Sequence, residues 1–229
     1  MASNDLIVVT AATSNEGGTL SLYREQLAKA GIDFHIEDIS SQPRPSLGGN
    51  SGIKTDQMIS LSQRFANYQK IVFTDAFDMT FWSSKDEVIS KIPDDHVLWG
   101  AEKNCYPDAE IAAKIPDRGP WRFGNGGFLC GTPEAMIAWA RKLRTRPDYH
   151  QNVLDQQYLN IYLAEQDDFV QIDWKTELVF CLYGGYPELE FVKGKPVNMT
   201  YGTYPAWCHA NGSWNATEMW DKYERSLQV

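Results

Sequence analysis

The stretch Lys70–Asp78, which reads KIVFTDAFD, decides the fold class of this chain. Its apolar run contains β-branched residues and ends abruptly at two carboxylates, Asp75 and Asp78. A buried parallel strand is a near-continuous apolar run, and open α/β sheets bind ligands beyond the carboxyl ends of their strands. Carboxylate oxygens at that edge suit a divalent cation. The competing interpretation is a strand that ends in a solvated acidic turn, and this stretch alone does not separate the two.

The segments before this stretch predict the same kind of sheet. Leu6–Thr10 is a first buried strand, and the small polar residues 11–14 form a turn through which a ligand can approach the backbone. Apolar residues at helical spacing predict a helix over residues 20–30, and alternating residues predict a strand over residues 32–36. This β-α-β order within the first forty residues indicates a parallel sheet.

The pattern continues to residue 107. Residues 40–52 form a loop rich in Ser, Pro and Gly, and Lys54 follows it at the start of an amphipathic helix. Ser84 begins a capping box for a short helix, and Val97–Ala101 is a further buried strand that ends at polar residues. The order βαβαβ with polar residues at successive strand ends is typical of a nucleotide-binding α/β sheet.

The second half of the chain has a different texture. A glycine-rich segment over residues 121–131 begins a strand, and helices are predicted over residues 133–144 and from residue 155. Three short strands are predicted at residues 169–173, 179–181 and 207–209. A C-terminal helix is predicted at residues 218–227. No internal repeat or linker separates the halves. We therefore predict one domain over residues 1–229, with two functional halves that meet near residue 105.

Composition sets broad limits on function. The chain is 43% hydrophobic and 22% charged, and its formal net charge of −9 argues against a non-specific nucleic-acid binder, which needs a basic face. The polar N-terminus does not resemble a signal peptide, and no apolar run approaches the roughly 20 residues that span a membrane. The four cysteines form no CxxC pair and are expected to be buried small hydrophobes. We therefore expect a cytoplasmic protein without a membrane partner.

Four further positions carry candidate chemistry, each with a plain structural alternative. His209 follows a short apolar run and is the best candidate for a third metal ligand beside the two acids, although strand-end histidines are often only structural. The Asn125–Gly127 segment allows a ligand close to the backbone, or forms only a tight turn. Asp155 is favoured at a helix N-terminus with or without a function, and Lys54 could meet a phosphate or only solvent.

Five segments occur in an order that resembles the glycosyltransferase domain of the procollagen lysyl hydroxylases and, more loosely, the procollagen galactosyltransferases. They are FTDAFD (73–78), AEKNCYP (101–107), FGNGGF (123–128), Asp155-Gln156 and HANG (209–212). Each is weak singly, and the resemblance extends from Val8 to about Gly212. It implies a GT-A fold, an α/β architecture with a single Rossmann-like, mixed and mostly parallel sheet flanked by helices. The half before residue 105 would bind the nucleotide, and the half from 106 the sugar and the acceptor.

The resemblance also implies a UDP-sugar as donor, Mn²⁺ or another divalent cation as cofactor, and roles for named residues. The metal would be bound by Asp75, Asp78 and His209. Tyr106 stands on the acceptor side, where the family usually has tryptophan. Asp155 and Glu102 are the candidate catalytic residues, with the choice of base left open. The donor would contact Thr10, Ala11, Thr13, Lys54, Thr74, Asp75, Phe77, Asn125, Gly126, Gly127, Asp155, Gln156, Asn211 and Gly212.

Two departures from the family pattern concern the donor site. An acidic run of the family is reduced here to Asp155, and Asn215 stands where the family has a lysine after the HxNG motif. Diphosphate binding at that end is therefore supplied differently or is weakened. We recognise no hydroxylase domain in these residues, so a collagen acceptor does not follow from the resemblance.

The leading hypothesis is transfer of a hexose, with glucose or galactose favoured, from a UDP-sugar to a hydroxyl-bearing acceptor. The acceptor class stays open among proteins, glycans, small molecules and modified nucleobases. A metal-dependent phosphohydrolase or nucleotidyltransferase is the first alternative, because such enzymes also use acids at strand ends. A catalytically inactive UDP-sugar-binding module is the second. A homodimer is retained as an expectation about assembly.

Overall fold

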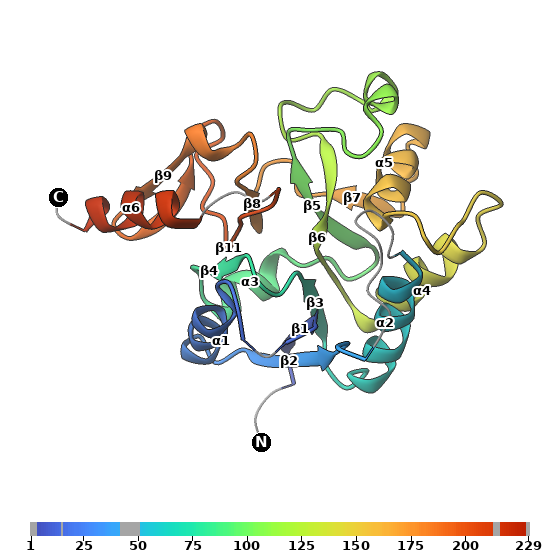
Figure 1. The fold of residues 1–229 in the computed structure, drawn as a ribbon, viewed down its shortest axis with the longest axis horizontal. Coiled ribbons are helices and arrows are strands. Elements are labelled where there is room, and N and C mark those ends of the chain that lie inside the picture. The colour runs from blue at the N-terminus through green and yellow to red at the C-terminus, as the bar shows by residue number, and fades with distance from the viewer. Residues whose placement is uncertain (1–3, 15, 42–50, 213–215, 228–229) are drawn as a thin grey trace.

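The computed structural model describes residues 4–14, 16–41, 51–212 and 216–227. Its central sheet has six strands, in the order β2 (Asp33–Asp38), β1 (Leu6–Ala12), β3 (Lys70–Thr74), β6 (Phe123–Gly131), β5 (Val97–Glu102) and β7 (Val170–Ile172). β1 pairs in parallel with β2 and β3, and β5 pairs in parallel with β7. β6 is antiparallel to both of its neighbours, β3 and β5. The expected mixed, mostly parallel sheet is confirmed (Figure 1).

Side chains that alternate along these strands cover both faces of the sheet. In β1, Ile7 and Val9 join a core with α2 (Ser51–Arg64), α4 (Pro133–Arg144) and α5 (Asp155–Glu165). Leu6 and Val8 point to the other face, where α1 (Leu20–Lys29) and α3 (Lys85–Lys91) contribute buried residues. Because successive side chains of a strand point to opposite faces, a continuous apolar strand requires cover on both sides. The helices of Figure 1 provide that cover.

A second, three-stranded sheet brings distant parts of the chain together. Its order is β4 (Met79–Phe81), β11 (Trp207–His209) and β8 (Val179–Cys181). β11 is antiparallel to β4, with His209 opposite Met79, and the Ala210 N–H donates to the Asp78 carbonyl at 2.8 Å. This pairing places the C-terminal part of the chain beside the turn that follows β3.

The remaining elements lie around these two sheets. β9 (Leu189–Val192) and β10 (Lys195–Asn198) form an antiparallel hairpin, and α6 (Ala216–Ser226) packs against β9. Two 3₁₀ helices, η1 and η2, span Ala109–Lys114 and Tyr186–Glu188. Figure 1 shows the hairpin and α6 together, to one side of the central sheet. Within the described residues, no helix is both long enough and apolar enough to cross a bilayer.

Local signals explain where several helices begin. The Ser84 side chain accepts a hydrogen bond from the Glu87 N–H at 3.4 Å, which caps α3 as the capping-box pattern predicts. The Thr132 hydroxyl accepts one from the Ala135 N–H at 3.2 Å, and a proline at the first helical position follows it in α4. These predicted helices are confirmed.

Three expectations need correction. The Asn125–Gly127 segment lies inside β6 rather than at its start, because β6 begins at Phe123 and is buried along its whole length. Gly124 permits this burial, since a Cβ there would lie 2.2 Å from a methyl carbon of Leu159. Residues 51 and 52 belong to α2 rather than to the loop before it, whose residues 42–50 lie outside the described part. Cys105 is half-buried, because it sits on the wall of a cleft.

Candidate functional site

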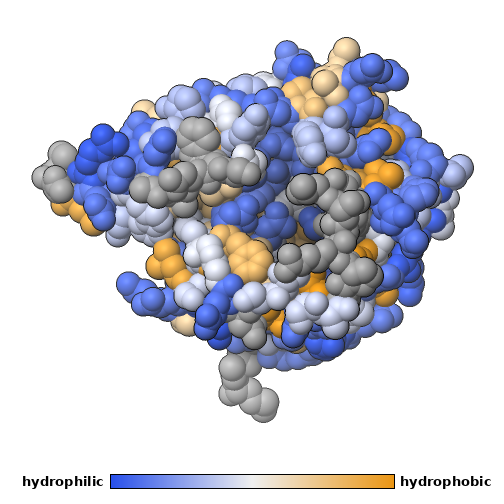
Figure 2. Space-filling model, viewed as in Figure 1, coloured by the Kyte–Doolittle hydropathy of each residue, from blue (hydrophilic) through white to orange (hydrophobic). Residues whose placement is uncertain are grey.

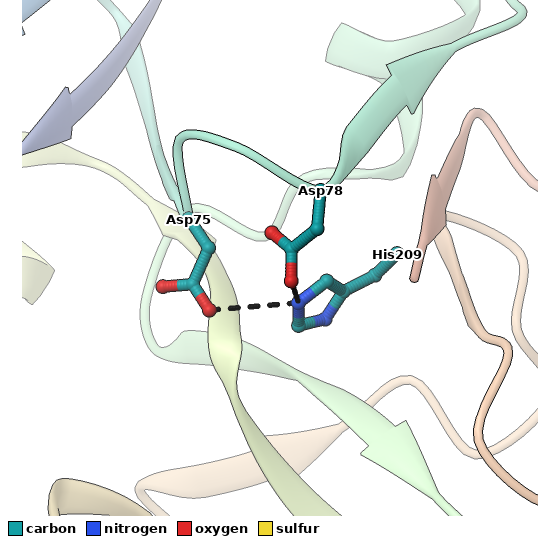
Figure 3. A group of neighbouring side chains, drawn as sticks. All are labelled: Asp75, Asp78 and His209. Atoms are coloured by element: carbon teal, nitrogen blue, oxygen red, sulfur yellow. Dashed lines mark hydrogen bonds and ion pairs between the residues drawn. The ribbon is translucent and has the colours of Figure 1, made fainter. Parts of the chain in front are cut away.

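Asp75, Asp78 and His209 meet at the edge of the central sheet. The nearest ring nitrogen of His209, Nε2, lies 3.2 Å from a carboxylate oxygen of Asp78 and 3.5 Å from one of Asp75. One potential ligand atom from each residue lies within 4.8 Å of the others. Figure 3 shows the two carboxylates and the imidazole turned toward one another from the ends of three different strands.

Strand register produces this convergence. β3 ends at Thr74, and the Asp75 N–H donates to the Gly127 carbonyl of β6 at 2.9 Å. Asp78 directly precedes β4, and β4 pairs with β11 so that His209 lies opposite Met79, the residue after Asp78. The Asp-x-x-Asp spacing therefore spans the turn between two strands of different sheets, and β11 supplies the histidine.

The charges within this group are strongly coupled. Burial of His209 disfavours its charged form, but Asp78 and Asp75 beside it raise its pKa well above the usual range. Partial removal of Asp75 from solvent favours its neutral form, but Lys54 and His209 hold its pKa well below the usual range. Two carboxylates thus keep a positive charge between them, and a divalent cation bound there would displace the histidine proton.

The space around the His209 ring and the hydrogen bond of its other ring nitrogen also fit a bound cation. A Cβ on Gly127 would lie 2.1 Å from a ring carbon of His209 and 2.7 Å from an Asp75 oxygen, so only glycine leaves room for this arrangement. The other ring nitrogen, Nδ1, lies 3.1 Å from the amide oxygen of Asn125. That oxygen already accepts from the Gly127 N–H at 2.9 Å, and a proton on Nδ1 would give it a second hydrogen bond and leave Nε2 free as a ligand.

Lys54 and Asp155 form a second charged pair across the sheet edge. The Lys54 ammonium lies 3.2 Å from an Asp155 oxygen and 3.7 Å from an Asp75 oxygen, and it donates to the Gly126 carbonyl at 2.9 Å. Burial would lower the pKa of Lys54, but Asp155 and Asp75 raise it above the usual range. Asp155 is 2% exposed at the first residue of α5. A lysine at this position could meet a phosphate without leaving its acidic partners.

Glu102 is the centre of a buried amide network. One of its oxygens accepts from the Asn211 side chain at 2.8 Å, and the other accepts from the Gln156 side chain. The amide oxygens of these partners accept in turn from the Tyr183 N–H and the Gly126 N–H, both at 3.0 Å. Burial raises the pKa of Glu102, and these amide hydrogen bonds oppose the rise. Glu102 therefore fixes backbone segments on two sides of the site.

These groups line a cleft of about 720 Å³. Its walls combine the metal-type cluster, Lys54, Asp155 and the Glu102 network with further residues, namely Asn104, Cys105, Tyr106, Asn125, Gly126, Gly127, Leu154, Tyr183 and Gly212. Figure 2 shows hydrophilic residues gathered around the central hollow of this face. A volume in this range suits a small-molecule substrate.

A smaller and more apolar pocket adjoins the cleft. It measures about 150 Å³ and shares Lys54, Asp75 and Gly126 with the cleft. The rest of its lining is Ala11, Ile39, Ile53, Gln57, Met58, Phe73, Thr74 and Leu129. One continuous surface thus runs from an apolar pocket past the Asp-Asp-His cluster to a polar cleft.

Most residues expected at the site line one of these two cavities, but three do not. Thr10, Thr13 and Phe77 are absent from both linings among the described residues. Thr10 is buried and donates to the Thr74 carbonyl at 2.7 Å. Phe77 lies against Gly17 and Gly18. Asn215 lies outside the described residues, so its suggested effect on diphosphate binding stays a prediction.

Several lining residues were not expected from the sequence. The main ones are Tyr183 and Asn104 in the cleft, and Ile39, Ile53, Gln57, Met58, Phe73 and Leu129 in the apolar pocket. Tyr183 precedes the pair Gly184-Gly185, which is a signal for a loop near a site. Gln57 carries no such signal, because it is one polar residue within an amphipathic helix.

Comparisons with known proteins show which sequences this chain is similar to. A multifunctional procollagen lysine hydroxylase and glycosyltransferase of Caenorhabditis elegans is 29% identical over 91% of this chain and 30% of its own length. Mouse procollagen-lysine,2-oxoglutarate 5-dioxygenase 1 is 26% identical over 91% of this chain and 30% of its own length. An uncharacterised protein of Acanthamoeba polyphaga mimivirus is 25% identical over 72% of this chain and 37% of its own length. The chain thus spans about a third of the length of these relatives.

A solved structure supports the fold. A glycosyltransferase involved in the glycosylation of the major capsid of PBCV-1 matches with a TM-score of 0.57, covering 98% of this chain and all of that one, at 12% identity. A family model described as the PLOD GT domain matches residues 2–222, which is nearly the whole sequence. This chain therefore belongs to the PLOD glycosyltransferase (GT) domain family.

Proposed function

We propose that this protein is a metal-dependent glycosyltransferase that moves a hexose, glucose or galactose, from a UDP-sugar to a hydroxyl group of an acceptor. Membership of the family implies a donor and an acceptor. The identity of the donor, the metal and the hexose are our own inference. The observation that carries it is the cluster of Asp75, Asp78 and His209 on the wall of a polar cleft, where Asp75 also lines an adjoining apolar pocket.

This order of surfaces matches the order of groups in a nucleoside diphosphate sugar. A base is flat and largely apolar on its faces, which suits the small pocket. The diphosphate would lie where the two cavities meet, beside Asp75 and Lys54, and the sugar would extend into the larger cleft. The carboxylates of Asp75, Asp78 and Asp155 outnumber the positive charges of Lys54 and His209 here, so a divalent ion such as Mn²⁺ would be needed to attract a diphosphate.

The residues of the chain divide the work as follows. Asp75, Asp78 and His209 would hold the ion, which as a Lewis acid neutralises the negative charge on the departing UDP. Lys54 would contact the diphosphate as a further positive charge. Asp155, whose carboxylate faces the cleft beside Gly126, would orient the sugar hydroxyls.

Glu102 takes a different role in this proposal from that of a catalytic base. Both of its oxygens accept hydrogen bonds from amide side chains, and its side chain is buried. A carboxylate engaged in this way has little freedom to accept a proton from an acceptor hydroxyl. We therefore assign Glu102 as a positioning residue for Gln156 and Asn211.

A panel of UDP-sugars tests the proposal. The purified chain is incubated with each donor and Mn²⁺, and released UDP is measured with and without excess chelator. We expect Mn²⁺-dependent release with UDP-glucose or UDP-galactose, lost in Asp78→Asn and kept in the surface control Asp86→Asn. A phosphohydrolase would instead cleave the diphosphate and release UMP and a sugar phosphate, and an inactive module would bind UDP without releasing it from any donor. Turnover that persists in the Asp78 variant or with chelator would contradict the metal assignment.

A further inference from the structure

Gln57 is a buried polar residue whose amide nitrogen has no partner among the described residues. Gln57 is 8% exposed, and its Nε2 makes no hydrogen bond to any part of the chain that the structure describes. A buried donor without a partner costs free energy, so such a group in a protein needs an explanation. Gln57 lines the apolar pocket, where a ligand could supply the missing acceptor.

The same face of α2 presents three residues to the two cavities. Lys54, Gln57 and Met58 follow at helical spacing, and all three line the apolar pocket. Lys54 also lines the larger cleft, whereas Gln57 does not. About one helical turn therefore separates a cation shared by both cavities from an amide that lines only the apolar pocket.

The size of the pocket limits the ring that it can take. Its volume of about 150 Å³ is comparable to an engineered apolar cavity of about 150 Å³ that binds benzene. A single six-membered ring fits such a space, which favours a pyrimidine over the larger purine. Apart from Gln57, Thr74 and the shared polar rim, the walls are apolar side chains, such as Ile53, Met58 and Leu129.

We propose that Gln57 determines which nucleobase the donor carries, by donating its amide N–H to a carbonyl of uracil. This inference rests on the proposed function, because it places the base of the donor in the apolar pocket. The C4 carbonyl of uracil, which lies beside its N3–H, would accept this hydrogen bond. Cytosine has an amino group in place of one carbonyl, and that group would face Gln57 donor to donor.

Calorimetric titration with nucleoside diphosphates in the presence of Mn²⁺ tests this role. UDP, CDP and ADP are titrated into the wild type, Gln57→Met and Gln57→Glu, with inorganic pyrophosphate as a probe that has no base. Gln63→Met is the matched control, because Gln63 is an exposed glutamine of the same helix.

The wild type should bind UDP more tightly than CDP or ADP. Gln57→Met should weaken UDP binding about tenfold, which is the size of one lost hydrogen bond, and should leave pyrophosphate binding unchanged. Gln57→Glu replaces the donor by an acceptor and should shift the preference from UDP toward CDP. Gln63→Met should behave as the wild type.

Two outcomes would overturn the inference in distinguishable ways. If UDP binds but its preference over CDP is the same in the wild type and both Gln57 variants, Gln57 does not recognise the base, and the proposed function still stands. If no nucleoside diphosphate binds to the wild type with Mn²⁺, the proposed function and this inference both fail. Circular dichroism of each variant checks that it is folded.

Discussion

Replacing Glu102 by glutamine tests whether one buried carboxylate organises the cleft. The change keeps the shape of the side chain but turns one of its two acceptor oxygens into a donor. In the wild type, these oxygens accept from Asn211 at 2.8 Å and from Gln156. The new amide would therefore face one of these partners donor to donor.

The partners cannot rotate their amides to repair the loss. Their oxygens already accept from the Tyr183 N–H and the Gly126 N–H, each at 3.0 Å, and a rotated amide would leave that backbone group unpaired. A hydrogen bond to a charged group contributes about 1.5–3 kcal/mol. Burial raises the pKa of Glu102, which shows that the buried charge is itself unfavourable, so removal of that charge offsets part of the lost hydrogen-bond free energy. We expect a net loss of about 2 kcal/mol in the free energy of unfolding.

Thermal unfolding followed by circular dichroism measures this loss. For a chain of this size, about 2 kcal/mol corresponds to a decrease in Tm of roughly 4–8 °C. Glu110→Gln, on the exposed 3₁₀ helix η1, is the control and should unfold with the wild type. A Glu102→Gln protein that melts within about 1 °C of the wild type would refute the network as a source of stability.

Three further perturbations have expected results. Because the pKa of His209 is raised, its proton stabilises the metal-free fold at low pH, and this contribution is lost as pH rises through that pKa. The affinity for Mn²⁺ should therefore increase up to about tenfold per pH unit over that range. Calorimetric titration measures this affinity, and a constant value would contradict the expectation. Gly127→Ala places a Cβ 2.1 Å from the His209 ring and should abolish Mn²⁺ binding in the same titration, so retained binding would show that the ring is not confined. Lys54→Met leaves the buried Asp155 carboxylate unpaired and should lower the free energy of unfolding, measured by urea denaturation, by about 2–3 kcal/mol. Adding Asp155→Asn should recover part of this loss. If the effects of the two substitutions were purely additive, coupling between Lys54 and Asp155 would be excluded.

The sheet was predictable because its strands carry local signals. Leu6–Thr10, Lys70–Thr74 and Val97–Ala101 are near-continuous apolar runs, and such runs are buried on both faces. The direction of β6 was less accessible, because its glycines hide the alternation that marks a strand. β4 has only three residues, which is too short for any periodic pattern. Its pairing with β11 depends on residues about 130 positions apart.

The site shows the same division between local and non-local information. Asp75 and Asp78 are a visible pair in sequence. His209 was a candidate third ligand with a plain structural alternative, and the order of five weak segments favoured its role as a ligand. The Glu102 network joins side chains from β5, α5 and the segment after β11, and no spacing rule connects them. Gln57 was missed because its significance depends on the missing partner of one nitrogen atom, which only the packed structure reveals.

The most direct test of the account is the linkage between Mn²⁺ and UDP binding. UDP is titrated into the wild type, Asp75→Asn and Asp78→Asn, first with Mn²⁺ and then with excess chelator. We predict that Mn²⁺ strengthens UDP binding to the wild type at least tenfold and that either substitution removes this increment. Equal UDP affinity with Mn²⁺ and with chelator in the wild type would contradict the claim that Asp75, Asp78 and His209 form a metal–diphosphate site.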